Sequence, residues 1–197
     1  MAPEYTPSDS AVLASTTRWL ERAVIGLNLC PFAKAPHVKG QIYLAICRAT
    51  KAEDLLGVLE QELNALAAAD PEARDTTLLI APDCFPDFLD FNDFLSDADE
   101  VLARLELDGT LQIASFHPRF QFVGTQVDDI TNYTNRAPFP VLHLIRESSI
   151  ARAVQAFPQA EMIYEKNMQT LQELGHEGWA ALGLEMPKCP VHDGGKP

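Results

Sequence analysis

The chain has little positive charge. Its 197 residues include 15 lysines and arginines against 28 aspartates and glutamates, a formal net charge of -13. Proteins that bind nucleic acid generally need a basic surface that neutralises phosphates, so this composition argues against such a partner. Hydrophobic residues make up 47% and charged residues 22%, values typical of a globular protein rather than a disordered one.

Long apolar runs and a cysteine framework are also missing, and we expect no secretion signal. No segment approaches the roughly 18 apolar residues of a membrane span. The N-terminus, MAPEYTPSDS, has no basic region leading into an apolar stretch. The four cysteines form no CxxC pair and no disulfide pattern. We therefore expect a cytoplasmic protein that does not associate with membranes. The absence of a glycine-rich phosphate loop means that no nucleotide cofactor is indicated.

What the chain does contain is a regular alternation of helical and strand patterns. Apolar runs predict four strands, at 41–47, 76–82, 110–117 and 141–146. Apolar residues spaced three and four apart predict helices at 11–27, between Thr50 and Asp70, over 88–105, near 148–157, over 159–174 and around Trp179.

This order predicts an α/β fold, because strands that alternate with helices usually pair in parallel through crossover connections. We predict a single domain over residues 1–187, with a four-stranded, mostly parallel sheet and flanking helices. Residues 188–197 are predicted to form a flexible C-terminal tail. The alternative is a two-layer α+β arrangement that resembles the ferredoxin fold.

His117 is the first candidate for chemistry. It closes the third predicted strand, and ligands in open α/β sheets tend to bind beyond the carboxyl ends of strands. The 23 residues that follow, 118–140, have no clear element of their own, and loops longer than roughly 12–15 residues are usually functional or disordered. The aromatic residues of this loop favour an ordered segment that lines a site. The alternative is a loop that only covers one end of the sheet.

Two arginines are candidates for binding an anionic substrate. A guanidinium such as that of Arg136 or Arg146 suits bidentate binding of carboxylate or phosphate. Arg146 ends the fourth predicted strand, just before a helix whose N-terminus also favours anions. Asn132 and Asn135 are further substrate-binding candidates, although local side-chain turns are their simpler explanation.

His143 is the second candidate for acid/base catalysis. It shares a strand face with Val141 and Ile145, where a lone histidine is most often a core residue. If the third and fourth strands are neighbours, His117 and Arg146 are expected to converge at one edge of the sheet. Cys30 follows the first helix, whose C-terminal dipole disfavours a thiolate. It is retained only as a substrate-contact candidate, with packing as its simpler role.

A metal site is the alternative use of the histidines. His117 and His143 with Asp129 could form a two-histidine, one-carboxylate site, and Asp128 or Glu147 could replace Asp129. No helical HxxxH or HxxE spacing supports it.

Several segments together resemble a known family. They are "WLERAVIGLNLCPFA", "FPDFLDFNDFL", "LQIASFHPRFQFVGT", "DDITNYTNRAPFPVLHLIRE" and "YEKNMQTLQELG". These resemble domain of unknown function 1415, a family of bacterial and plant proteins without an established activity, so the resemblance implies no reaction. Its shared signature falls on Cys30, His117, Asn135, Arg136, His143 and Arg146, whereas Arg119 occupies a variable position.

The leading hypothesis is an enzyme that acts on a small phosphate- or carboxylate-bearing metabolite. His117 would be the general acid/base, His143 would assist it, and Arg136 and Arg146 would bind the anion. A metal-dependent enzyme or metal carrier is one alternative. A non-catalytic protein that binds a partner through the aromatic loop is another.

Overall fold

The computed structural model describes residues 6–156 and 162–184. The elements follow in the order α1 (Asp9–Trp19), π-helical η1 (Leu20–Ile25), α2 (Lys34–Val38), β1 (Ile42–Ile46), α3 (Ala52–Ala68), β2 (Thr76–Ile80), α4 (Phe88–Arg104), β3 (Leu111–Phe116), 3-10 helix η2 (Ile130–Asn135), β4 (Val141–Arg146), α5 (Glu147–Ala156) and α6 (Ile163–Ala181). All four strands lie where the sequence predicts them. Only the short helices α2 and η2 were not predicted.

The strands form one mixed sheet in the order β1-β2-β4-β3. β1 and β2 are parallel, with Ile42 opposite Thr76. β4 runs antiparallel to both of its neighbours, with Thr76 opposite Ile145 and Phe116 opposite Val141. The four-stranded α/β sheet is confirmed, but the expectation that it is mostly parallel is wrong.

The connections explain the direction of β4. A parallel connection must carry the chain back along the whole length of the sheet, which usually requires a helix. The 17-residue helices α3 and α4 do this after β1 and β2. Between β3 and β4 the chain contains only the six-residue η2, so it re-enters the sheet at the end where β3 leaves it. β4 therefore points the opposite way and is inserted between β2 and β3.

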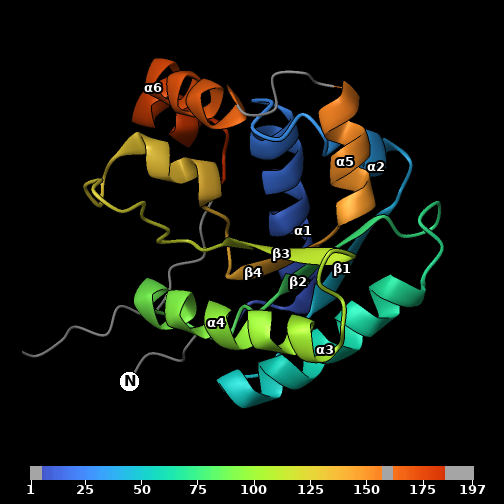
Figure 1. The fold of residues 1–197 in the computed structure, drawn as a ribbon. Helices are drawn as coiled ribbons and strands as arrows, with labels where there is room; N and C mark the ends of the chain where they lie inside the picture. The colour runs from blue at the N-terminus through green and yellow to red at the C-terminus, as the bar shows by residue number, and fades with distance from the viewer. Residues whose placement is uncertain (1–5, 157–161, 185–197) are drawn as a thin grey trace, which may run out of the picture.

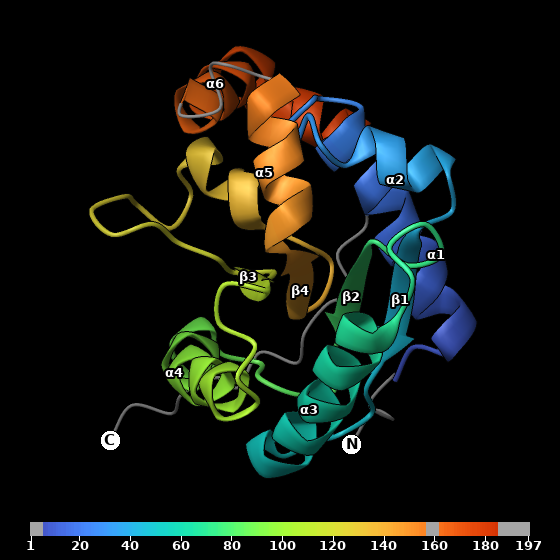
Figure 2. The ribbon, with the colours of Figure 1, turned by 45° about the vertical axis from the view of Figure 1, so that its right-hand side comes forward.

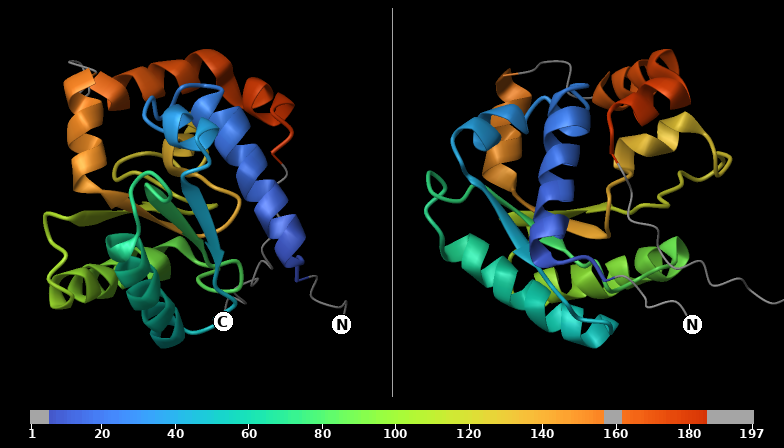
Figure 3. Two further views of the ribbon diagram at one scale, coloured as in Figure 1. Left: turned by 90° about the vertical axis from the view of Figure 1, so that its right-hand side faces the viewer. Right: turned by 180° about the vertical axis from the view of Figure 1, so that it is seen from behind.

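Helices cover both faces of the sheet (Figures 1 and 3). α3 and α4 pack against one face, where Leu63, Leu79 and Phe91 are fully buried. α1, α5, α6 and η2 lie on the other side, where Trp19 and Leu171 belong to a second core. Because helices pack on both faces, the two-layer ferredoxin-like alternative is wrong.

The helix ends largely follow the sequence. Ser8 caps α1 by accepting a hydrogen bond from the Ala11 backbone N–H at 3.3 Å. The last two predicted helices are joined into α6, which bends at Gly175, a residue with φ of 64°. No helix of residues 6–156 and 162–184 is long and apolar enough to cross a membrane. The predicted tail, 188–197, lies outside the described residues.

Candidate functional site

The sheet topology separates two of the predicted site residues. β3 and β4 are neighbours, but they are antiparallel, so Phe116 pairs with Val141 at one end and Leu111 with Arg146 at the other. His117, which directly follows Phe116, therefore lies at the opposite end of the sheet from Arg146. The expectation that they converge at one edge is wrong.

His117 is fully enclosed, with 1% of its surface exposed. Its Nδ1 accepts a hydrogen bond from the Arg119 backbone N–H at 3.0 Å, and its Nε2 lies 3.0 Å from the carbonyl oxygen of Phe85. Because a carbonyl can only accept, Nε2 carries the proton and the ring is neutral. Burial lowers its pKa, and the hydrogen bond to Phe85 opposes this effect. The ring also stacks on Phe91, with centroids 5.3 Å apart.

This arrangement gives His117 a structural task. Both ring nitrogens are occupied by backbone groups, so neither can reach a substrate in this conformation. The carbonyl that it holds belongs to Phe85, whose φ of 55° lies in the left-handed region that bulky residues rarely adopt. His117 thereby ties the turn after β2 to the turn after β3.

Asn135 and Arg136 lie beside His117. Asn135 accepts a hydrogen bond at its backbone oxygen from the His117 N–H at 3.1 Å, and its Nδ2 donates to Ser115 O at 3.3 Å. Arg136 donates through Nε to Phe120 O at 3.0 Å and through Nη2 to Val127 O at 2.6 Å. Both side chains therefore hold backbone of the long loop and of β3.

Asn132 completes the ordering of that loop. Its Oδ1 accepts from the Phe122 backbone N–H at 2.9 Å and the Thr125 hydroxyl at 2.8 Å, while its Nδ2 donates to Gln126 O at 2.8 Å. All of these partners belong to the same loop. The geometry favours the structural explanation of Asn132 over a substrate-binding role.

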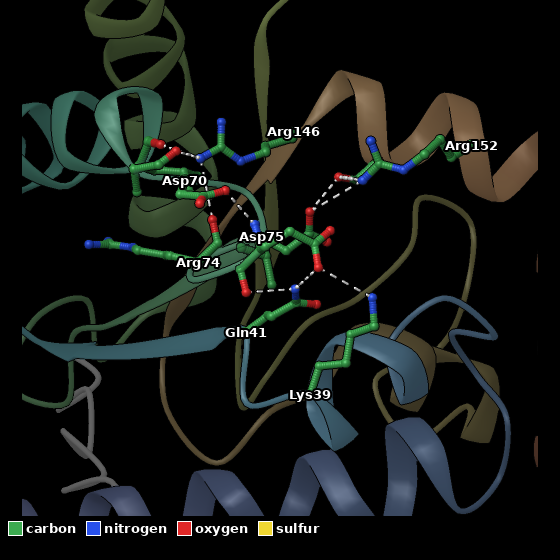
Figure 4. A network of polar contacts seen from close by, with 12 residues as sticks. Lys39, Gln41, Asp70, Arg74, Asp75, Arg146 and Arg152 are labelled. Carbon is green, nitrogen blue, oxygen red and sulfur yellow. Dashed lines mark hydrogen bonds and ion pairs between the residues drawn. The ribbon is translucent and has the colours of Figure 1, made fainter.

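Arg146 is engaged at the other end of the sheet, as Figure 4 shows. Its Nη2 donates to Leu66 O at 2.6 Å, to Ala69 O at 2.7 Å and to Arg74 O at 3.3 Å. The first two carbonyls belong to the C-terminal end of α3, where a cation is favourable. Arg146 thus fixes the end of α3 to the sheet, and its fork is not free for bidentate anion binding.

Cys30 and Asp129 also have structural surroundings. Burial raises the pKa of the Cys30 thiol, and Cys30 packs against the second core. Asp129 accepts hydrogen bonds from the Thr131 N–H at 2.9 Å and hydroxyl at 2.7 Å, which cap η2 and lower the carboxyl pKa. Within the described part of the chain, no group of three or more His, Cys, Asp or Glu side chains could hold a metal ion.

His143 stands apart from the other candidates. It lies in the middle of β4, and its side chain shares a face of the sheet with Gln112, Ala114, Phe116 and Ile145, the positions next to it on β3 and β4. All five are half-buried. We call this set the open sheet face. In Figure 2, α5 stands upright from the end of β4. At one end of this face, the Phe116 ring packs edge-on against Trp19 of α1, with centroids 5.2 Å apart.

A relay of hydrogen bonds sets the proton position on His143. The Thr76 hydroxyl donates its single hydrogen to Leu144 O at 2.6 Å. Its oxygen lies 2.7 Å from His143 Nε2 and must therefore accept the Nε2–H bond. The ring is held in one tautomer, with Nδ1 unprotonated.

Nδ1 is the free atom of this arrangement. No further hydrogen bond of His143 is formed in residues 6–156 and 162–184. Buried side-chain polar atoms that lack a partner there are Thr16 Oγ1, Thr134 Oγ1 and Arg146 Nε, so Nδ1 is not a buried atom. Burial of the ring lowers the pKa of His143 from 6.5 to about 4, which makes it neutral at pH 7.

Three threonines on the His143 side of the sheet are not singled out by the sequence. Thr76 is the relay itself, and a hydroxyl at the start of the fully buried strand β2 was the available signal. Thr16 in α1 and Thr134 in η2 have buried hydroxyls without a partner, in two elements on the His143 side of the sheet (Figure 1). Such groups usually bond water or a ligand.

Comparison with known proteins gives a family and nothing beyond it. The family model described as "Protein of unknown function (DUF1415)" matches residues 11–181. No curated protein and no solved structure matches the chain. The match confirms the resemblance found in the sequence and covers the sheet, the loop and His143. The chain belongs to the DUF1415 family.

Proposed function

We propose that the protein is an enzyme in which His143 acts as a general base toward a small substrate bound on the open sheet face. The observation that carries this proposal is the Nδ1 atom of a ring that Thr76 holds in one tautomer, because Nδ1 is unprotonated and has no hydrogen-bond partner among the described residues. A general base needs this combination of a free lone pair and a fixed orientation.

The proposed substrate carries negative charge. With a pKa of about 4 the free ring is a weak base, because its surroundings do not compensate an imidazolium. A phosphate or carboxylate beside the ring would stabilise the protonated form and raise the pKa toward neutrality, where proton transfer is most effective. This charge would come from the substrate itself, since His143 forms no ion pair among the described residues.

The roles predicted for the other residues change accordingly. His117 is not part of this proposal, because both of its nitrogens are engaged. Arg136 and Arg146 are not part of it either. Arg136 donates to carbonyl oxygens of the long loop, and the Arg146 side chain lies on the opposite face of β4 from His143, where it bonds the end of α3.

The test is a comparison of the wild-type chain with His143→Gln. Glutamine keeps a donor toward Thr76 but has no basic nitrogen, so the fold should survive. Both proteins are incubated in D2O with a defined mixture of phosphorylated and carboxylated metabolites, and substrate loss and deuterium incorporation are followed by NMR and mass spectrometry. We expect turnover by the wild type alone. Equal turnover by His143→Gln, or none by either protein, would overturn the proposal.

A second experiment tests directly whether an anion binds beside His143. The pKa of His143 is measured by NMR titration in the presence of inorganic phosphate or malonate. We expect it to rise from about 4. An unchanged pKa at saturating anion would contradict the proposal that the substrate is anionic. The proposal that His143 acts as a base would not be affected.

Partner binding through the long loop is the second candidate function. Val123 and Val127 of this loop are exposed, at 105% and 69% of their surfaces. Apolar side chains exposed together on a loop favour contact with another protein. Replacing both with serine should leave His143-dependent turnover unchanged. A loss of turnover would instead place the loop in the enzyme's own site.

A further inference from the structure

β3 is an edge strand, and the direction of its backbone groups can be assigned. It pairs with β4 alone, and Figures 1 and 2 show it at the margin of the sheet. The Glu147 N–H donates to Thr110 O at 3.0 Å across this pair, so Thr110 and every second residue after it face β4. Because backbone direction alternates along a strand, Leu111, Ile113 and Ser115 direct their N–H and C=O groups away from the sheet.

The two ends of this outer edge are already bonded within the chain. The Leu111 N–H donates to Leu107 O at 3.0 Å. At the other end, Asn135 Nδ2 donates to Ser115 O at 3.3 Å. Four groups lie between them without a partner in the described residues: Leu111 O, Ile113 N–H, Ile113 O and Ser115 N–H.

These four groups complement a second copy of themselves. If another β3 lies antiparallel across a two-fold axis at Ile113, each Ile113 N–H meets the other Ile113 O, and each Ser115 N–H meets the other Leu111 O. The two groups that would complete the ladder, Leu111 N–H and Ser115 O, are those already satisfied internally. We propose that two copies of this chain associate through antiparallel pairing of their β3 edges, which joins the two sheets into one.

The composition of β3 supports this occupant. Edge strands are usually protected against pairing by lysine, proline or a bulge. Leu111–Phe116 reads LQIASF and contains neither a charged residue nor a proline. Two chains of net charge -13 repel each other, so an uncharged strand is a favourable place for close approach.

The pairing has a structural consequence for the open sheet face. Residues directly opposite each other in an antiparallel pair point to the same side of the sheet. Gln112 of one copy would therefore lie opposite Ala114 of the other, and the open faces of both copies would become continuous. The proposed association does not depend on His143 being a base.

Amide hydrogen exchange of the full chain tests the pairing with an internal control. NMR exchange rates are compared at protein concentrations about 50-fold apart, because association depends on concentration. Exchange of the Ile113 and Ser115 amides should slow at the higher concentration. The amides of Gln112 and Ala114 already bond β4, so their exchange should not change. If the Ile113 and Ser115 amides exchange equally fast at both concentrations, the proposal is wrong.

Sedimentation velocity of three variants supplies the second test. Ser115→Pro removes a free N–H at an edge position that tolerates proline, whereas the matched control Ser115→Ala retains it. We expect association to weaken at least about tenfold for Ser115→Pro, a loss of roughly 1.4 kcal/mol or more, and to be unchanged for Ser115→Ala.

Ile113→Lys decides the question if Ser115→Pro fails to fold, because it places two like charges opposite each other on the two-fold axis. It should abolish association. Added salt should strengthen wild-type association by screening the repulsion. A wild type that stays monomeric at the higher concentration, or an Ile113→Lys variant that associates like the wild type, would overturn the proposal.

Discussion

His117 and His143 are two histidines of one sheet with opposite surroundings. His117 is 1% exposed, and backbone groups occupy both of its nitrogens. His143 is half-buried, with Nε2 held by Thr76 and Nδ1 free. Burial lowers the pKa of both rings, so burial alone does not distinguish them.

The position in the chain causes this difference. His117 lies where β3 ends and two turns meet, and the backbone groups of turns have no strand partner, so they bond the imidazole. His143 lies inside a central strand whose backbone is already paired on both sides. Its ring bonds a side chain, that of Thr76, and Nδ1 has no partner among the described residues. We therefore place the proposed base inside the strand rather than at its end.

The largest expected effect is the loss of stability on replacing His117. His117→Ala leaves a cavity beside Phe91 and removes the partners of the Arg119 N–H and Phe85 O, so we expect a loss of about 4 kcal/mol. Urea unfolding followed by circular dichroism measures it. The control His143→Gln should lose less than about 1 kcal/mol. Equal losses would mean that the two rings are structurally equivalent.

The pH dependence of stability separates the same two residues. The folded-state pKa of His143, about 4, lies below its ordinary value of 6.5. The unfolded chain therefore binds the proton first, and stability present above pH 6.5 is lost as the pH falls toward 4, by about 3 kcal/mol for this residue. Unfolding titrations between pH 7 and 4 should show a shallower loss in His143→Gln. At pH 7 and above, the difference in stability between the wild type and the variant should not change with pH; identical slopes below pH 7 would contradict the assignment.

Arg146 extends the comparison to the other end of the sheet. Arg146→Met keeps the aliphatic stem but removes the hydrogen bonds to Leu66 O and Ala69 O, with an expected loss of about 2 kcal/mol. The matched control is Arg104→Met, because the bond of Arg104 within the described residues is an exposed ion pair with Glu60, worth less than about 1 kcal/mol. Urea unfolding compares the two. Similar losses would show that Arg146 does not hold the end of α3.

The smallest expected effect concerns the relay. Thr76→Val keeps the shape of the side chain but removes the acceptor of the His143 Nε2–H, so we expect a loss of about 1 kcal/mol. The more specific readout is the tautomer. Ring ¹⁵N chemical shifts should show one tautomer in the wild type and a mixture in Thr76→Val. A single, unchanged tautomer in the variant would mean that another group orients the ring.

The sequence predicts where most helices and strands lie, but not which strands pair in parallel and which antiparallel. The alternation in "VLHLIR" located β4 and placed His143 on one face of it, because alternation follows from strand geometry alone. It did not reveal that β4 runs antiparallel. The sequence has no long helical pattern between β3 and β4, and the direction of β4 follows from this short connection. The prediction that His117 and Arg146 lie at the same edge of the sheet is wrong for this reason.

The candidate site was predicted as a set of residues rather than as an arrangement. His143 was named, but Thr76 was not, although the two lie 2.7 Å apart. They are separated by 67 positions in the chain, and no local pattern connects them. Arg136 and Arg146 are candidates because a guanidinium group can bind anions. The residue type does not show whether its N–H groups already donate to carbonyl oxygens of the protein.

The sequence by itself determined the strands, the main helices, the excess of negative charge and the side of β4 on which His143 lies. These properties depend on composition and on the local geometry of the backbone. Only the tertiary structure decided which imidazole nitrogen is free, which arginine ends a helix and which edge of the sheet is unpaired. Such properties depend on partners distant in the chain, and packing selects those partners.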